Sequence, residues 1–114
     1  MKHPKNLGGR RRVSARNEIA DIFRRGSKCS AREFAVTYVA NRKGQDRLGV
    51  LVGKRHGNAV ERNRLKRIVR EAVRQCPAET TSFLDVLVQP RAGTRMSFHR
   101  FSEAYRLWRK SVTN

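Results

Sequence analysis

Apolar residues recur at two periods along the chain, and the first segment has the period of a helix. Ile19, Ile22 and Phe23 recur at helical spacing after Ser14, a residue type that can cap a helix N-terminus. Gly26 follows two arginines and is typical of a helix end. The pattern predicts a short first helix between residues 14 and 26.

The next segment has the alternation of a strand. In REFAVTYVA, residues 32–40, Phe34, Val36 and Tyr38 fall on one face and the residues between them on the other. NRKGQD supplies turn residues before a second apolar run, RLGVLVG, at residues 47–53. We therefore predict that these two runs form a β-hairpin. SFLDVLVQP, ending at Pro90, predicts one more short strand.

The C-terminal segment SFHRFSEAYRLWRK predicts a closing helix. Phe98, Phe101, Tyr105 and Trp108 fall on one stripe of that helix. This spacing is what docking a helix on a sheet requires, so we expect the aromatic stripe to be core.

The segment GKRHGNAVERNRLKRIVREAVR, residues 53–74, predicts a basic amphipathic helix. Asn58 is a good N-cap, Glu61 can complete a capping box, and Pro77 stops the helix. One side, which we expect to pack on the sheet, carries the apolar residues Leu65, Ile68, Val69, Ala72, Val73 and Cys76. The opposite side carries Asn63, Lys66, Arg67, Arg70 and Arg74, and Arg62 and Arg64 project along the two flanks.

The charge of the chain indicates a polyanionic ligand. Lys and Arg number 27 against 9 Asp and Glu, a formal net charge of +18, which opposes compaction unless a polyanion neutralises it. Cations at a helix start also oppose the helix dipole, and arginine can grip phosphate bidentately or stack on bases. A merely solvated helix face would carry more acids than Glu61 and Glu71. Membrane binding is disfavoured because no run of 18 apolar residues exists.

Length and composition indicate one domain with a basic extension. We predict that residues 1–12 form a flexible basic arm and that residues 13–114 form a single RNA-binding α/β domain. Cys29 and Cys76 lack the spacing of a zinc site or redox pair, so we expect buried reduced thiols. The N-terminus lacks the apolar run of a signal peptide, so we expect a cytoplasmic protein.

GKRHGNAVERNRLKRIVRE resembles the signature of the protein subunit of bacterial ribonuclease P. That signature runs Lys, Lys or Arg, any residue, Gly, Asn, Ala, Val, any residue, Arg, Asn, Arg, any residue, Lys, Arg, and it matches residues 54–67. DIFRRGSKCSAREFAV is similar to the family's first helix and following strand, so the resemblance spans roughly residues 14–110.

The resemblance implies an α+β fold, a two-layer α/β sandwich like domain 2 of ribosomal protein S5. The order would be helix, three strands, helix, strand, helix, with a four-stranded sheet and a left-handed βαβ crossover through the basic helix. In the family this helix contacts the catalytic RNA subunit. The RNA-binding residues predicted here are Lys54, Arg55, Asn58, Arg62, Asn63, Arg64, Lys66, Arg67 and Arg70.

The resemblance also implies a cleft between the first helix and the central sheet that binds the single-stranded 5′ leader of precursor tRNA. Phe23 and Phe34 match family aromatics there, and Val36 and Tyr38 share the face of Phe34, so these four residues are predicted to line the cleft. The sequence departs from the family at Ile19, where many members have an aromatic, and at Tyr38, where an aromatic is not typical.

No constellation for RNA cleavage by the chain itself is visible. Glu18 and Asp21 are three residues apart, but a helix N-terminus attracts acids for dipole reasons alone. Of the histidines, only His56 lies beside the basic segment, without a partner for acid and base roles. The chain is thus predicted to bind no metal and to assist a catalytic RNA whose own Mg²⁺ carries the chemistry, with no obligate protein partner.

Two other classes remain open from the residues. A small ribosomal protein would share the charge, the size and an α/β fold, but it would not need an apolar and aromatic cleft for single-stranded RNA. A DNA-binding module is weaker still, because the basic helix follows a strand and a glycine turn instead of another helix.

Overall fold

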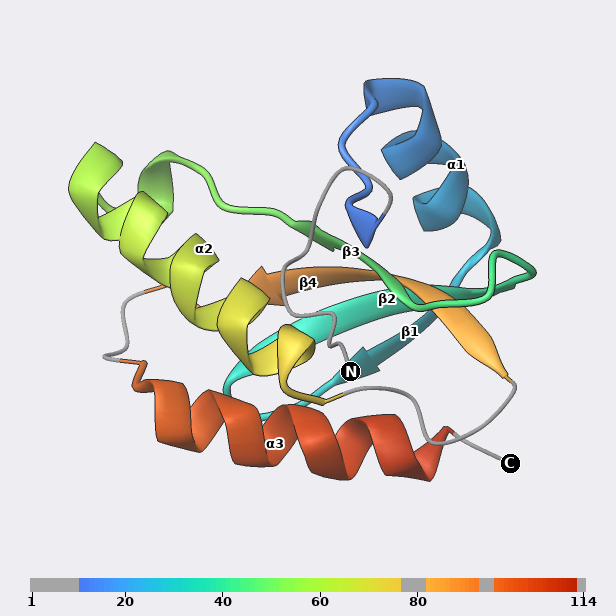
Figure 1. Cartoon of the computed structure of the whole chain (residues 1–114). Helices are drawn as coiled ribbons and strands as arrows, with labels where there is room; N and C mark the ends of the chain where they lie inside the picture. The colour runs from blue at the N-terminus through green and yellow to red at the C-terminus, as the bar shows by residue number, and fades with distance from the viewer. Residues whose placement is uncertain (1–10, 77–81, 93–95, 113–114) are drawn as a thin grey trace.

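The computed structural model describes residues 11–76, 82–92 and 96–112. Its elements are α1 (Arg16–Arg25), β1 (Ser27–Ser30), β2 (Phe34–Asn41), β3 (Arg47–Val50), the 3-10 turn η2 (Lys54–His56), α2 (Ala59–Arg74), β4 (Phe83–Pro90) and α3 (Phe98–Ser111) (Figure 1). The predicted order of helix, three strands, helix, strand, helix is confirmed.

The four strands form one mixed sheet in the order β1-β2-β4-β3. β1 and β2 are antiparallel, β2 and β4 are antiparallel, and β3 and β4 are parallel, joined by the crossover through α2. The predicted hairpin between residues 32–40 and 47–53 is therefore wrong, because β4 lies between β2 and β3. β4 is almost entirely buried, as expected for a central strand covered on both faces, and it gains hydrogen-bonding partners on both sides.

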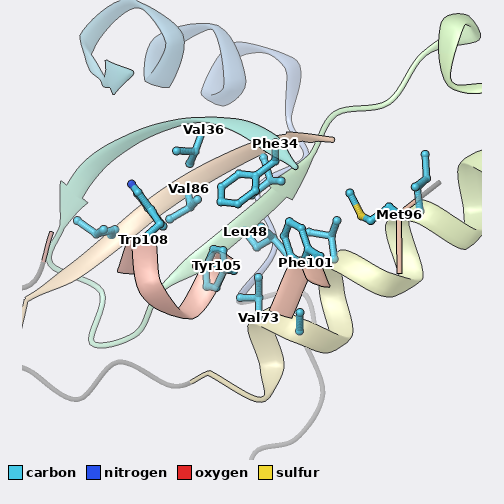
Figure 2. Packing of buried hydrophobic residues seen from close by; sticks show 14 residues of the cluster. Phe34, Val36, Leu48, Val73, Val86, Met96, Phe101, Tyr105 and Trp108 are labelled. Carbon is cyan, nitrogen blue, oxygen red and sulfur yellow. The ribbon is translucent and has the colours of Figure 1, made fainter. Parts of the chain in front are cut away.

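The main core lies between one face of the sheet and the helices α2 and α3 (Figure 2). Phe34 and Val36 point from β2 into this core, where the ring of Phe34 meets that of Phe101 edge to face with centroids 5.1 Å apart. Tyr105 and Trp108 continue the aromatic stripe of α3, as predicted. Phe98, at the start of α3, is exposed instead, because it precedes the part of the helix that lies on the sheet.

The helix α1 packs on the opposite face of the sheet (Figure 1). Its buried residue Ile22 meets Leu87 of β4 there. The N-cap of α1 is Ala15 without a side-chain cap, so the predicted cap at Ser14 is wrong. Gly26 ends the helix as predicted, and the reason is that no side chain fits at this position. A Cβ there would lie 2.6 Å from the carbonyl oxygen of Ile22.

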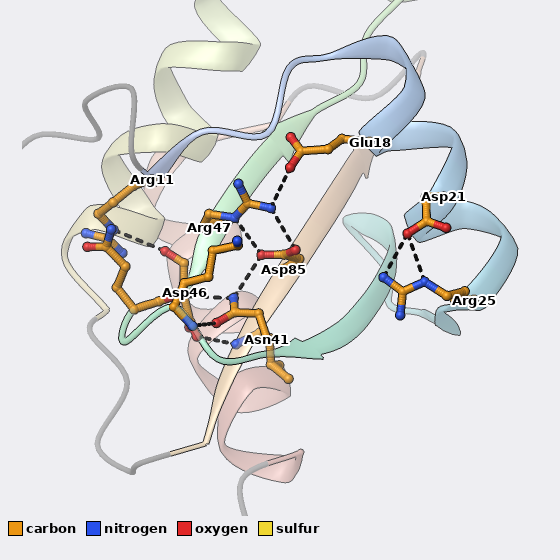
Figure 3. A network of polar contacts seen from close by, with 11 residues as sticks. Arg11, Glu18, Asp21, Arg25, Asn41, Asp46, Arg47 and Asp85 are labelled. Carbon is orange, nitrogen blue, oxygen red and sulfur yellow. Dashed lines mark hydrogen bonds and ion pairs between the residues drawn. The ribbon is translucent and has the colours of Figure 1, made fainter.

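Two ion pairs, one partly and one almost fully buried, tie the sheet and the turn before β3 to the helices (Figure 3). Arg47 of β3 binds the carboxylate of Asp85 on β4 at 2.8 Å and reaches Glu18 of α1 at 3.0 Å. Asp46 binds Arg109 of α3 at 2.8 Å, with both side chains almost fully buried. These pairs fix α1 and α3 on opposite faces of the sheet.

The part of the predicted arm that the structure describes lies against β3. Arg12 forms a parallel bridge with Leu48, and Val13 donates its N–H to the same residue's carbonyl at 2.8 Å. The arm's other residues, 1–10, lie outside the described ones. Cys29 is exposed on the edge strand β1, so the expectation that it is buried is wrong, whereas Cys76 is partly buried against the main core.

Candidate nucleic-acid interface

The start of α2 is fixed by the capping box that the sequence predicted. Asn58 accepts the N–H of Glu61 at 2.9 Å, and the Glu61 carboxylate accepts the N–H of Asn58 at 3.0 Å. Gly57, at φ 110°, precedes the cap, and a Cβ there would lie 1.9 Å from the Glu61 carboxylate. A glycine is therefore required at this turn. The helix ends at Arg74, and Pro77 lies outside the described residues.

The apolar side of α2 is buried as predicted, and its cations remain at the surface. Leu65, Val69, Ala72 and Val73 enter the main core, and Ile68 and Cys76 pack against it. Within the described part of the chain, no carboxylate pairs with Arg62, Lys66 or Arg67 of α2, nor with Lys54 or Arg55 of η2. Asn63 is exposed between Arg62 and Arg64. This surface therefore presents unneutralised positive charge at the positive end of a helix dipole.

Two arginines of α2, the predicted RNA-binding residue Arg64 and the C-terminal Arg74, bind other groups of the protein. Arg64 donates from Nη2 to the carbonyl oxygen of Met96 at 3.0 Å and so holds the segment that precedes α3. Arg74 pairs with Glu71 one turn earlier on the same helix, and this contact raises the pKa of Arg74 and lowers that of Glu71. Arg64 thus has a structural contact as well as an exposed position, whereas Arg74 is neutralised.

A cavity of about 220 Å³ lies where α2 approaches the segment before α1. Its cationic lining residues are Arg12, Lys66 and Arg70, and its apolar lining comes mainly from Val13, Ile19 and β3. No carboxylate is among the lining residues. Burial, and then the nearby charge of Arg12, lower the pKa of Arg70. An anion in this cavity would offset both effects, so the site has the chemistry of a phosphate-binding site.

The structure does not bring the four predicted cleft residues together. Phe34 and Val36 are 0% and 2% exposed beneath α3, and Tyr38 lies on the same face with its ring against Trp108. Phe23 packs on the opposite face, against the cluster of Val13, Ile22 and Leu87. The prediction that they line one cleft is wrong, because alternation along β2 shows which residues share a face but not which face a helix covers.

The α1 face presents a partly exposed aromatic ring beside cationic side chains. Phe23 is partly exposed, and the Lys28 ammonium lies over its ring at 5.6 Å from the centroid. Ile19, one turn earlier on α1, reaches the cavity that Arg12, Lys66 and Arg70 line. An apolar and aromatic surface on α1 is thus continuous with a cationic one.

Sequence reasoning missed Arg12 as a site residue. Its charge was read as part of a flexible arm, although the chain from Arg12 to Val13 pairs with β3. The available signal was the apolar Val13 directly after three arginines, which marks the point where the arm joins the core.

The described residues hold no group of three or more acidic, histidine or cysteine side chains that could bind a metal. Glu18 and Asp21 do not act together, because Glu18 pairs with Arg47 and Asp21 with Arg24 and Arg25. His99 is exposed on α3. Among the described helices, none is both long and apolar enough to cross a bilayer.

The fold and the basic helix define a small α+β protein of the ribonuclease P protein type. The profile of the Ribonuclease P family matches residues 7–112, and the chain belongs to that family. Family membership supports a role in tRNA processing by a ribonucleoprotein and does not favour the ribosomal-protein alternative.

Relatives and solved structures agree with this assignment. The chain is 41% identical to the ribonuclease P protein component of Shouchella clausii over 86 residues, 74% of this chain and 70% of the relative. It is 31% identical to that of Syntrophomonas wolfei over 100 residues, 87% of this chain and 84% of the relative. The RNase P protein structure from Thermotoga maritima superposes with a TM-score of 0.79 at 29% identity, covering 90% of this chain and 98% of that one.

Proposed function

We propose that this chain is the noncatalytic, RNA-binding subunit of a ribonuclease P that removes the 5′ leader from precursor tRNA. The start of α2 binds the catalytic RNA subunit, and the α1 side of the sheet holds the single-stranded leader. Mg²⁺ bound by the RNA supports the chemistry. The protein supplies positive charge that reduces phosphate repulsion between the two RNAs.

The observation that carries this proposal is the set of cations without acidic partners on α2 and around the cavity. Five of the described carboxylates, Glu18, Asp21, Asp46, Glu71 and Asp85, pair with arginines outside this set, and the Glu61 carboxylate is engaged by the N–H of Asn58. The charge on Arg62, Lys66, Arg67 and Arg70 is therefore left for a ligand. The cations at the helix start and those lining the cavity adjoin at Lys66, and together they suit two RNA segments, one at the helix start and one in the cavity.

The leader path follows from the α1 face. A single strand needs cations for its phosphates and exposed apolar or aromatic surface for its bases. The cavity supplies Arg12, Lys66 and Arg70, and α1 supplies Ile19 and Phe23 beside it. The proposed path thus differs from the predicted one by using the face of the sheet opposite Phe34.

The contact with the catalytic RNA is tested by the salt dependence of binding. We expect an Arg62→Ala, Lys66→Ala, Arg67→Ala variant to flatten the slope of log affinity against log salt by about 2 to 3, if each residue makes about one phosphate contact. The matched control removes three exposed cations from α3, Arg100, Arg106 and Lys110. An equal change of slope in both triple variants would show that the effect is nonspecific and would refute the assignment.

The leader site is tested with the assembled holoenzyme. We expect Arg12→Ala, Arg70→Ala to weaken binding of precursor tRNA and leave mature tRNA, which lacks the leader, bound about as before. The slope against salt for precursor tRNA should fall by about 1 to 2, since about 0.7 counterions are released per contact with a single strand. Equal weakening for both tRNAs would place the leader elsewhere.

The noncatalytic role is tested by adding the chain to a transcribed bacterial ribonuclease P RNA. Site-specific cleavage should require the RNA, and the protein should lower the Mg²⁺ concentration needed for 5′ processing. Site-specific cleavage by the RNA-free protein would overturn this role.

A further inference from the structure

His56 connects the turn before α2 to the end of the central strand. Its Nδ1 accepts the N–H of Gly53 at 3.0 Å, and its Nε2 lies 2.8 Å from the carbonyl oxygen of Pro90. A carbonyl oxygen can only accept, so Nε2 carries the proton, while Nδ1 must offer its lone pair to the Gly53 N–H. Both contacts together require the neutral imidazole with its proton on Nε2.

The start of α2 has few other attachments to the fold. The first buried residue of α2 is Leu65, so the residues from Ala59 to Arg64 have no side chain in the core. Backbone bonds within η2 join His56 to Gly53 and Gly57 to Lys54. Within the described part of the chain, the side-chain hydrogen bonds that link this segment to other elements are the bond from Arg64 to Met96 and the bond from His56 to the buried Pro90 at the end of β4.

From this geometry we propose that His56 is a positioning residue for the RNA contacts of α2. Its neutral ring holds η2 and Gly57 against the end of β4 and thereby sets where Arg62, Lys66 and Arg67 lie relative to the sheet. Protonation of Nδ1 removes the acceptor for Gly53 and loosens this link. The inference rests on the proposed function, in which the start of α2 binds the catalytic RNA.

The surroundings of His56 are rich in positive charge. The charged residues on the segments that it joins are Lys54 and Arg55 in η2, Glu61 in α2, and Glu33 and Arg91 beside Pro90. Three of these five are cations, and the Glu61 carboxylate is already engaged by the Asn58 N–H. A charged imidazole would therefore add a cation to a cationic segment as well as lose one hydrogen bond.

Three substitutions separate the two hydrogen bonds. His56→Gln places an amide at the ε position and can keep the donor to Pro90, whereas His56→Asn places one at the δ position and can keep the acceptor for Gly53. His56→Leu keeps neither. His99→Leu is the matched control, because the side chain of His99 is 84% exposed on α3.

Affinity is measured by filter binding of the full chain to a transcribed bacterial ribonuclease P RNA at constant salt. At pH 8 we expect His56→Leu to weaken binding roughly 10- to 30-fold, and His56→Gln and His56→Asn about 5-fold each. His99→Leu should stay within about 2-fold of the unmodified chain. Hydrogen exchange provides an RNA-free measurement: the Gly53 amide should lose protection in His56→Leu and His56→Gln but not in His56→Asn.

The pH profile distinguishes positioning by a neutral ring from a purely structural role. Histidine generally changes charge between pH 5 and 8, and glutamine does not. We expect the affinity advantage of the unmodified chain over His56→Gln to fall from about 5-fold at pH 8 to about 1-fold at pH 5.5, because the protonated ring also lacks an acceptor at Nδ1. The other histidines cancel in this comparison. A constant or rising advantage at pH 5.5 overturns the inference.

The Arg62, Lys66, Arg67 triple variant separates this inference from the proposed function. If that variant binds weakly while His56→Leu, shown to be folded by circular dichroism, binds like the unmodified chain, only the inference fails. If the triple variant also binds normally, the proposed RNA face and the inference both fail. Should His56→Leu not fold, the pH profile against His56→Gln decides alone.

Discussion

Removing the charge of Asp46 should unfold this protein at a markedly lower denaturant concentration. The Asp46 carboxylate receives Arg109 Nε at 2.8 Å and Nη2 at 3.0 Å, and it also accepts the N–H of Leu84 at 2.8 Å. The side chains of Asp46 and Arg109 are 4% and 3% exposed. Asp46→Asn keeps the shape but leaves a buried guanidinium without its carboxylate.

The expected cost follows from this burial. Breaking a buried ion pair by removing one partner typically costs about 3 to 5 kcal/mol of the free energy of unfolding. For a domain of this length each kcal/mol corresponds to about 4 °C, so the melting temperature should fall by about 12 to 20 °C. Urea denaturation followed by circular dichroism and by the fluorescence of the buried Trp108 would measure the change.

A charge-matched control is available on α1. Asp21→Asn also removes one negative charge from a strongly cationic chain, but Asp21 and its partners Arg24 and Arg25 are each more than a third exposed. Its cost should be below about 1 kcal/mol. Equal costs for Asp46→Asn and Asp21→Asn would refute the reasoning, because the loss would then come from net charge and not from burial.

Two further predictions concern the sheet. Phe34→Ala should cost about 3 to 5 kcal/mol of stability, because Phe34 is fully buried, and where the variant still folds it should weaken binding of precursor and mature tRNA equally. Phe23→Ala should mainly weaken binding of precursor tRNA, by roughly 5-fold or more. The reverse pattern would restore the Phe34 face as the leader site. Burial raises the pKa of Asp85, but the hydrogen bonds from Arg47 and Asn41 outweigh it and hold that pKa below its usual value. Since the folded-state pKa is depressed, Asp85 contributes stability above its unfolded pKa of about 4, and this stability is lost as pH falls from there through the folded-state pKa. The difference in unfolding free energy between pH 6 and pH 3, measured by denaturation, should therefore be smaller in Asp85→Asn than in the unmodified chain.

The sequence by itself determined the three helices, three of the four strands and the basic face of α2. Capping at Asn58 and Glu61, the apolar stripe from Leu65 to Val73 and the stripe of α3 each depend on neighbours within two or three turns. Periodicity reports such short-range relations directly. The cations on α2 could be assigned to the surface for the same reason.

Only the tertiary structure decided which strands pair and which residues meet across the sheet. β4 inserts between β2 and β3, a long-range choice that depends on the burial of β4 on both faces. Both faces of β2 are covered, as the burial of Phe34 on one side and Thr37 on the other shows, so alternation could not tell the leader face from the core face. The cavity arises because the chain at Arg12 and the middle of α2 meet across β3, residues more than fifty positions apart whose proximity no local pattern encodes.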